Sequence, residues 1–277
     1  MENPTGESAD GPLRFDFDRR VKVEFHGSQI TSDAGLLAYR ELDDALGLSA
    51  MAGNSLADTR TGKNGRHTLG GLLRQSVFGR LAGYEDVNDA ERLRHDPAMR
   101  WIVGGGAASG AAASPSQMGR FETRWLAASD NLSALADLSG QWIDRVHGRR
   151  PPRGIVLDMD SSVSPTHGEQ EESVWNGHYE CTCYHPLFVF NQFGDLERSA
   201  LRPGNVHSAD GWESVLKPVV ARYEGKVSRL YFRADAGFAN PDVYEFLEGE
   251  GIKYAIRIPT NRVLQDRIGY LLNRPVG

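Results

Sequence analysis

Apolar residues in the first half of the chain recur every three or four positions, the spacing of helices that bury one face. This spacing predicts a first helix that follows a cap at Thr31–Ser32–Asp33 and reaches Leu46. It also predicts helices over 68–81, 90–95, 97–102, 115–125 and 131–146. The last of these is expected to bury Leu132, Leu135, Leu138, Trp142 and Ile143. Apolar and charged residues alternate instead over 15–25, which predicts a short strand.

Shorter apolar runs dominate the second half, and turn residues separate them. They predict strands over 155–160, 183–190, 196–201, 230–234 and 253–258. Amphipathic helices are expected over 210–223 and 240–249. This order predicts an α+β or α/β fold, in which helices pack against a mixed sheet and right-handed crossovers join its parallel strands.

The same patterns predict three regions. Residues 1–13 are polar and are expected to be a disordered tail. A mostly helical N-terminal domain is expected over 14–150, with a flexible Gly/Ala/Ser connection at 104–113. The strand-rich domain is expected over 151–277, after a break at Arg149–Arg150–Pro151–Pro152.

Acidic residues follow two of the predicted strands. An apolar run typical of a strand buried on both faces leads into Asp158 and Asp160, which share one face because they lie two positions apart. No Lys or Arg follows nearby to neutralise them, so Mg²⁺ is the natural partner; the alternative is that one acid is an exposed loop residue. The second strand ends at Asp235, and two such strands can together hold a pair of metal ions.

Composition narrows the class of protein. No apolar run approaches the roughly 20 residues of a membrane-spanning helix, so we expect a cytoplasmic protein that does not bind membranes. The net charge of −6 counts against a strong nucleic-acid binder unless its basic surface is local. The cluster of His178, Cys181, Cys183 and His185 is too crowded for a typical zinc site, and we interpret these residues as ordinary half-buried ones.

Several motifs together resemble one family, the DDE transposases of bacterial insertion sequences, and within it the insertion sequence 1380 group. The N-terminal motifs are Gly83–Tyr84–Glu85–Asp86–Val87–Asn88–Asp89–Ala90, Leu93–Arg94–His95–Asp96–Pro97, Ser114–Pro115–Ser116–Gln117 and Arg120–Phe121–Glu122. The C-terminal motifs are Leu157–Asp158–Met159–Asp160, His167–Gly168–Glu169–Gln170, Tyr184–His185–Pro186–Leu187 and Arg233–Ala234–Asp235–Ala236–Gly237–Phe238. The resemblance extends from about residue 15 to the C-terminus and implies an RNase H-like catalytic core.

The resemblance also implies which acids hold the metal. The family's second Asp corresponds to Asp235. Its first Asp is followed two positions later by Thr or Ser, which favours Asp160, with Ser162 beyond it, and leaves Asp158 as the alternative or as a helper ligand. The family's third acid, a Glu, follows a segment inserted after the strand at 253–258, and the sequence stops at Gly277, before that segment ends. We therefore expect a C-terminally truncated chain with an incomplete core.

By the same resemblance, the cofactor is Mg²⁺ in a two-metal site, with Mn²⁺ as its substitute. The partner is double-stranded DNA, namely the transposon ends and the target, bound by a homo-oligomer near the nucleoid. The helical N-terminal half is expected to hold the terminal inverted repeats. The candidate phosphate-binding residues are Arg60, Lys63, Arg66, Arg74 and Arg80.

Two alternatives remain open. The chain could be a separate RNase H-like nuclease that completes its site with another acid of its own and cleaves DNA with a metal. It could instead be an inactive transposase remnant that binds DNA ends without cleaving them. Binding without cleavage separates the second alternative from the first.

Overall fold

The computed structural model describes residues 13–23, 31–105 and 110–272, with no description of the side chains of 13, 63, 64 and 272. The expected disordered tail, residues 1–13, therefore lies outside the described part except for the backbone of Leu13. Contacts divide the chain into two compact units, Met1–Val146 and His147–Gly277, and each is described separately.

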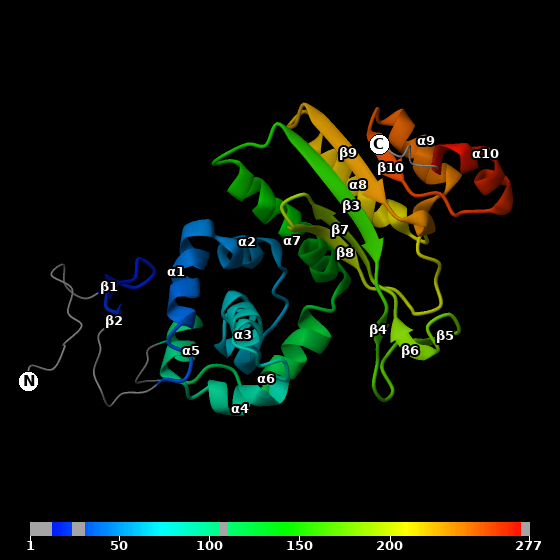
Figure 1. Cartoon of the computed structure of the whole chain (residues 1–277). Helices are drawn as coiled ribbons and strands as arrows, with labels where there is room; N and C mark the ends of the chain where they lie inside the picture. The colour runs from blue at the N-terminus through cyan, green and yellow to red at the C-terminus, as the bar shows by residue number, and fades with distance from the viewer. Residues whose placement is uncertain (1–12, 24–30, 106–109, 273–277) are drawn as a thin grey trace, which may run out of the picture. The chain divides into compact units, whose positions relative to one another are not determined.

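The N-terminal unit is mostly helical (Figure 1). Its α-helices are α1 (Leu36–Leu46), α2 (Leu48–Ser55), α3 (Leu69–Leu81), α4 (Ala90–Leu93), α5 (Pro97–Ile102), α6 (Pro115–Arg120) and α7 (Ser129–His147). The other elements are β1 (Leu13–Arg14), β2 (Lys22–Val23), the 3₁₀ turns η1 (Gly62–Arg66) and η2 (Val87–Asp89), and the π-helical turn η3 (Phe121–Trp125).

Side-chain caps fix the starts of several helices. The Thr68 side chain accepts a hydrogen bond from the backbone N–H of Gly71 at the start of α3. Asp96 accepts one from the N–H of Met99 and stands before a proline at the first position of α5. Each cap satisfies an N–H that has no partner inside the helix. The helices expected from 68 and 97 therefore begin where the sequence predicts them.

Two predictions for this unit are wrong, and one helix is not predicted. Residues 15–25 are not one strand, because two short antiparallel strands, β1 and β2, flank a turn there. Leu132 is about half exposed, and Asn131 is buried in its place. The helix α2 is missing from the prediction, because Gly47, with a φ of 78°, ends α1 and the chain re-enters a helix at once.

The expected flexible connection at 104–113 is also partly wrong. Residues 106–109 lie outside the described part, but Ala112 and Ala113 are buried in the core. The buried Gln75 of α3 donates to the carbonyl of Ala113 and accepts from its N–H, over 2.8 and 2.7 Å. This strand-like pairing through a glutamine side chain ties the end of the connection to the helical core.

The C-terminal unit contains, within its described residues, a five-stranded mixed sheet of order β10-β9-β3-β7-β8 (Figure 1). Its strands are β3 (Gly154–Ser161), β7 (Leu187–Asn191), β8 (Leu196–Ala200), β9 (Arg229–Ala234) and β10 (Lys253–Ile256). β3, β7 and β8 form an antiparallel meander, whereas β9 is parallel to both β3 and β10.

Helices complete this unit. They are α8 (Trp212–Tyr223), the 3₁₀ turn η4 (Ala236–Phe238), α9 (Pro241–Gly249) and α10 (Arg262–Leu272). α8 connects the meander to β9, and α9 connects β9 to β10, as expected for crossovers between strands of one sheet. The predicted fold class is confirmed as far as a mostly helical part followed by a mixed sheet with flanking helices.

The core of the C-terminal unit lies on one face of the sheet. Ile155, Leu157 and Met159 of β3 are buried with apolar side chains of α8 and α9. The alternate residues, Val156 and Asp158, are only partly buried. The prediction that β3 is buried on both faces is therefore wrong, and its acids lie on the accessible face, where no large desolvation cost arises.

A second sheet of order β4-β6-β5 accompanies the first within the described residues. Its strands are β4 (Ser164–Pro165), β5 (Val174–Asn176) and β6 (Cys181–Tyr184). The single strand predicted over 183–190 is wrong, because His185 and Pro186 separate β6 from β7 and the two belong to different sheets. A proline cannot donate to a strand ladder, which explains a break at this position.

Candidate functional site

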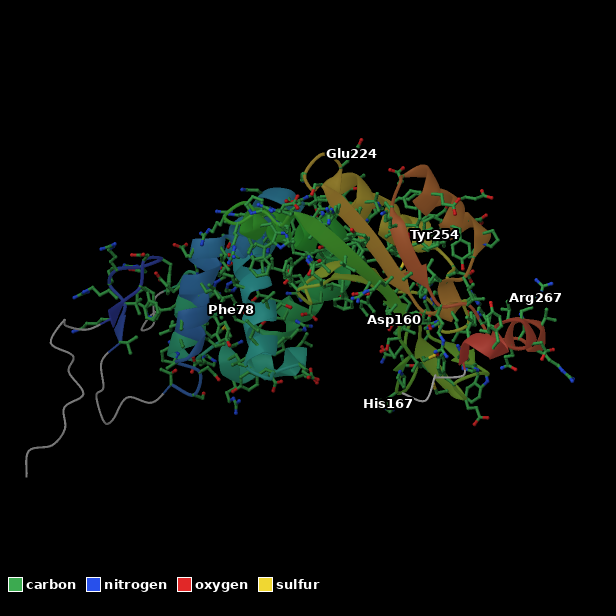
Figure 2. The ribbon with its side chains drawn as sticks, turned by 45° about the horizontal axis from the view of Figure 1, so that its top comes forward. Phe78, Asp160, His167, Glu224, Tyr254 and Arg267 are labelled. Carbon is green, nitrogen blue, oxygen red and sulfur yellow. The ribbon has the colours of Figure 1, made fainter. Side chains whose placement is uncertain are left out.

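The two candidate acids occupy neighbouring positions at the ends of parallel strands. The ladder between β3 and β9 ends with Met159 beside Ala234. Asp160 follows Met159 within β3, and Asp235 is the first residue after β9. Asp235 continues the extended backbone of β9, with φ −78° and ψ −174°. Because adjacent strands lie about 4.8 Å apart, the two carboxylates can bind a common ion. Figure 2 shows Asp160 at the carboxyl end of β3.

Both carboxylates are exposed and each is oriented by a backbone N–H. Oδ1 of Asp160 accepts from the N–H of Ser161 over 2.8 Å. Oδ1 of Asp235 accepts from the N–H of Gly237 over 2.9 Å, at the start of η4. Two oxygen donors on adjacent strands fit a hard divalent cation such as Mg²⁺. Among the described residues, however, no three His, Cys, Asp or Glu side chains gather into a metal-binding group.

Asp158 has a different partner. Its two carboxylate oxygens accept from Nε and Nη2 of Arg233 over 2.7 and 2.6 Å. The two residues lie side by side in the ladder, so the cation that neutralises Asp158 comes from the adjacent strand and not from the residues that follow it in sequence. The Asp158 hydrogen bonds raise the pKa of Arg233, which keeps this guanidinium charged.

A loop between β8 and α8 approaches Asp235, and no pattern in the sequence predicts it. The backbone carbonyls of His207, Ser208 and Asp210 all accept from Nη1 of Arg202, a buried side chain whose Nε bonds to the carbonyl of His185. Burial lowers the pKa of Arg202. Arg202 thereby fixes the loop in the position that places Ser208 next to Gly237.

The close approach of this loop makes Gly237 a sensitive position. A Cβ at residue 237 would lie 2.9 Å from Cβ of Ser208 and 3.1 Å from Oδ1 of Asp235. Gly237→Ala must therefore displace either the loop or the carboxylate. We expect Mn²⁺ affinity, measured by electron paramagnetic resonance, to fall about 10-fold, as for other residues that orient a metal ligand. Gly249→Ala, where a Cβ has open space, is the control, and equal affinity in both variants would contradict the expectation.

Two of the candidate phosphate-binding arginines are part of the fold of the N-terminal unit. The Arg60 side chain is 1% exposed, forms two hydrogen bonds of 2.6 Å to Asp58 and stacks on the Trp125 ring. Nε of Arg74 donates to Oγ of Ser49 over 2.9 Å, and burial lowers the pKa of Arg74. Both guanidiniums are thus bound to groups within the N-terminal unit.

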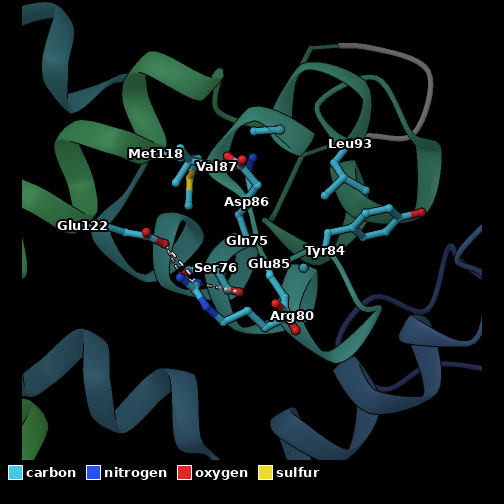
Figure 3. A pocket seen from close by; sticks show the side chains of 12 residues that line it. Gln75, Ser76, Arg80, Tyr84, Glu85, Asp86, Val87, Leu93, Met118 and Glu122 are labelled. Carbon is cyan, nitrogen blue, oxygen red and sulfur yellow. Dashed lines mark hydrogen bonds and ion pairs between the residues drawn. The ribbon is translucent and has the colours of Figure 1, made fainter. Parts of the chain in front are cut away.

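The other candidates differ in their surroundings. Arg80 is half exposed and joins α3 to η3 by an ion pair with Glu122 of 3.0 Å (Figure 3). It also donates a short hydrogen bond to Ser76, one turn earlier on α3. These side chains line a small pocket that includes Tyr84 and part of the motif after it. Arg66 is exposed. The side chain of Lys63 lies outside the described part.

The residues of the cysteine and histidine cluster differ in burial, since His178 is exposed and Cys181 is half-buried. Cys183 and His185 are buried, and burial raises the pKa of the Cys183 thiol. A Cβ at Gly204 would lie 2.4 Å from the carbonyl oxygen of Cys183, so this glycine allows the loop after β8 to pack directly on β6. No metal-binding group of three such side chains is found in this cluster within the described residues.

Comparisons with known proteins come from sequence families and from solved structures. One similar structure is a piggyBac transposase synaptic complex with hairpin DNA, whose sequence is 14% identical to this chain. The match covers 82% of this chain and 50% of the piggyBac chain, with a TM-score of 0.36. Another is the Mos1 strand transfer complex, which is 15% identical. That match covers 93% of this chain and 69% of the Mos1 chain, with a TM-score of 0.25. The chain thus spans half the length of the piggyBac chain. No curated protein matches the sequence.

Within the described residues, no helix has the length and apolar character needed to cross a membrane. The model of the family described as transposase DDE domain group 1 matches residues 13–276, nearly the whole sequence. The chain therefore belongs to the transposase DDE domain group 1 family.

Proposed function

We propose that this chain is part of a metal-dependent transposase, in which Asp160 and Asp235 hold Mg²⁺, or Mn²⁺ in its place. The observation that carries the proposal is the register of β3 and β9, in which both acids follow the same last pair of the ladder. Asp160 is a better candidate than Asp158 for the first of the family's catalytic acids, because Arg233 occupies both carboxylate oxygens of Asp158. The match to the transposase DDE domain spans both acids and supports the transposase part of the proposal.

The bound ions would activate a hydroxyl for attack on a phosphodiester and stabilise the charge on the leaving oxygen. The protein's contribution is to hold two carboxylates at a fixed separation. The rigid ladder sets the position of the two strands, and the N–H groups of Ser161 and Gly237 orient one oxygen of each acid. Arg202 holds the loop that places Ser208 next to Gly237, the residue whose N–H binds Asp235.

The substrate in this proposal is double-stranded DNA, cut at terminal inverted repeats and joined to a target. We assign the element to the insertion sequence 1380 group on the motifs after Gly83 and around Asp235. The N-terminal helical unit would hold the DNA ends, and a homo-oligomer would bring two ends together. An alternative within the same chemistry is an RNase H-like nuclease without end specificity.

The test uses linear DNA that carries the element's terminal repeats, with a scrambled duplex as the comparison. Metal-dependent cleavage restricted to the repeats supports the transposase, whereas equal cleavage of both duplexes supports the nuclease. Binding to the repeats without cleavage in Mg²⁺ or Mn²⁺ supports an inactive remnant. Absence of both binding and cleavage would reject DNA as the substrate of this chain.

Among the arginines of the N-terminal unit, Arg66 is expected to contact DNA and Arg60 to stabilise the fold. Arg66→Gln should weaken duplex binding and reduce the slope of log affinity against log salt by about 0.9, because one phosphate contact is lost. Arg60→Gln should instead lower the melting temperature, because it leaves Asp58 without its ion pair. Salt titrations by fluorescence anisotropy and thermal melts separate the two, and an unchanged slope for Arg66→Gln would contradict the first expectation.

A further inference from the structure

Arg233 lies on the same face as the proposed metal ligands and one step away from them. Asp158 and Asp160 are two residues apart on β3. Arg233 lies on β9, and Asp235, two residues later, continues its extended backbone. Two residues of a strand span about 6.6 Å, so the guanidinium lies within a side chain's length of the carboxylate pair. The face is accessible: the Arg233 side chain is 57% exposed and that of Asp158 is 37% exposed.

The ion pair uses only one edge of the guanidinium. Asp158 takes one N–H from Nε and one from Nη2. A guanidinium has five N–H donors, so the two of Nη1 and the second of Nη2 are directed away from Asp158. These three donors form the end of the fork that matches two oxygens of a phosphate. Asp158 thus fixes the plane of the guanidinium and leaves its phosphate-binding edge uncovered.

The position of Arg233 matters because its surroundings are acidic. Asp158, Asp160 and Asp235 would repel a DNA phosphate from this face in the absence of cations. Metal ions at Asp160 and Asp235 would cancel the charge at the end of the ladder, and Arg233 cancels that of Asp158. A phosphate next to the one that reacts would then meet a positive, preoriented donor.

We propose that Arg233, oriented by Asp158, binds the DNA phosphate that flanks the reacting phosphate. Arg233 is therefore a substrate-binding residue, and Asp158 is its positioning residue and not a third metal ligand. The proposal rests on the proposed function, since it takes DNA as the substrate and Asp160 with Asp235 as the metal site. The competing explanation is that the pair merely joins β3 to β9, which for exposed groups contributes little to stability.

The experiment measures duplex binding and metal binding by the full chain. Duplex affinity is followed by anisotropy over a salt series in Ca²⁺, with a random-sequence duplex because a phosphate contact is independent of sequence. Mn²⁺ binding without DNA is followed by electron paramagnetic resonance. The variants are Arg233→Gln, Arg233→Lys and Asp158→Asn, and Lys217→Gln removes an exposed cation of α8 as the matched control.

We expect Arg233→Gln to bind DNA about 10-fold more weakly, with a salt slope smaller by about 0.9, while Mn²⁺ affinity is kept. Arg233→Lys should retain the slope but recover only part of the affinity, because a lysine lacks the fork. Asp158→Asn should keep the slope and the Mn²⁺ affinity and weaken DNA binding about 3-fold. Lys217→Gln should change neither quantity.

Three outcomes would overturn the proposal. Wild-type affinity and slope in Arg233→Gln would make the arginine a link between strands only. A 10-fold or greater loss of Mn²⁺ affinity in Asp158→Asn would make Asp158 a metal ligand. Tighter DNA binding by Asp158→Asn would show that this acid repels the phosphate and does not orient Arg233. Failure of the proposed function itself is read separately, from Mn²⁺ binding that persists in Asp160→Asn.

Discussion

Asp160→Asn and Asp235→Asn are each expected to reduce Mn²⁺ affinity by about 100-fold or more, and to abolish any metal-dependent DNA cleavage by the chain. Loss of a group that only supports a ligand typically costs 10- to 100-fold, so loss of a ligand itself should cost at least the upper value. The amide keeps the size of the side chain but carries no charge. Both acids are exposed, so the fold should tolerate either change.

Electron paramagnetic resonance of free Mn²⁺ measures the affinity, and a supercoiled plasmid measures cleavage. Asp158→Asn is the internal comparison, because its carboxylate already binds Arg233. Glu245→Gln, an exposed position on α9, controls for the loss of one negative charge from the same unit. If Asp160→Asn and Glu245→Gln bound Mn²⁺ equally well, the assignment of the metal site to the ends of β3 and β9 would be rejected.

The sequence could predict which acids stand at strand ends but not the partner of each. Asp160 and Asp235 follow apolar runs, and this local pattern is sufficient to place them at the carboxyl ends of two strands. The pairing of Asp158 with Arg233 depends on the register between strands 75 residues apart in sequence. A signal does exist, since Asp158 stands two residues before Asp160 and Arg233 stands two residues before Asp235.

Other features of the site come from packing between distant segments. The contact between Ser208 and Gly237 requires the loop after β8 to be held by a buried arginine, and no periodicity in the sequence reports that. Similarly, a basic residue looks the same in sequence whether it binds a phosphate or an internal acid. Arg60 is held by Asp58, two positions away, which a search for neighbouring opposite charges could have found.

Stability of the C-terminal unit should depend strongly on one buried acid far from the candidate site. The Glu197 side chain is fully buried, forms an ion pair with Arg222 of α8 and accepts hydrogen bonds from the Tyr223 hydroxyl over 2.6 Å and from Nδ2 of Asn191 over 2.7 Å. These contacts join β7, β8 and α8. A buried charge with all its partners is tolerated, but removal of one partner leaves the others unsatisfied.

Glu197→Ala is expected to destabilise the unit by about 3 kcal/mol, because Asn191, Arg222 and Tyr223 each lose a bond to a buried carboxylate, at a site where the Arg222 side chain is only 15% exposed. The corresponding fall in melting temperature is roughly 10 °C. Circular dichroism melts of the full chain measure it, and Glu213→Gln, in an exposed pair on the same helix, should shift the free energy of unfolding by less than about 1 kcal/mol. Because apolar pairs can replace buried ion pairs, the double change Glu197→Leu with Arg222→Met should recover the part of the loss that comes from Arg222, while the bonds from Tyr223 and Asn191 stay lost. A melting temperature for Glu197→Ala equal to that of Glu213→Gln would mean that the buried pair contributes nothing net to the stability of the sheet.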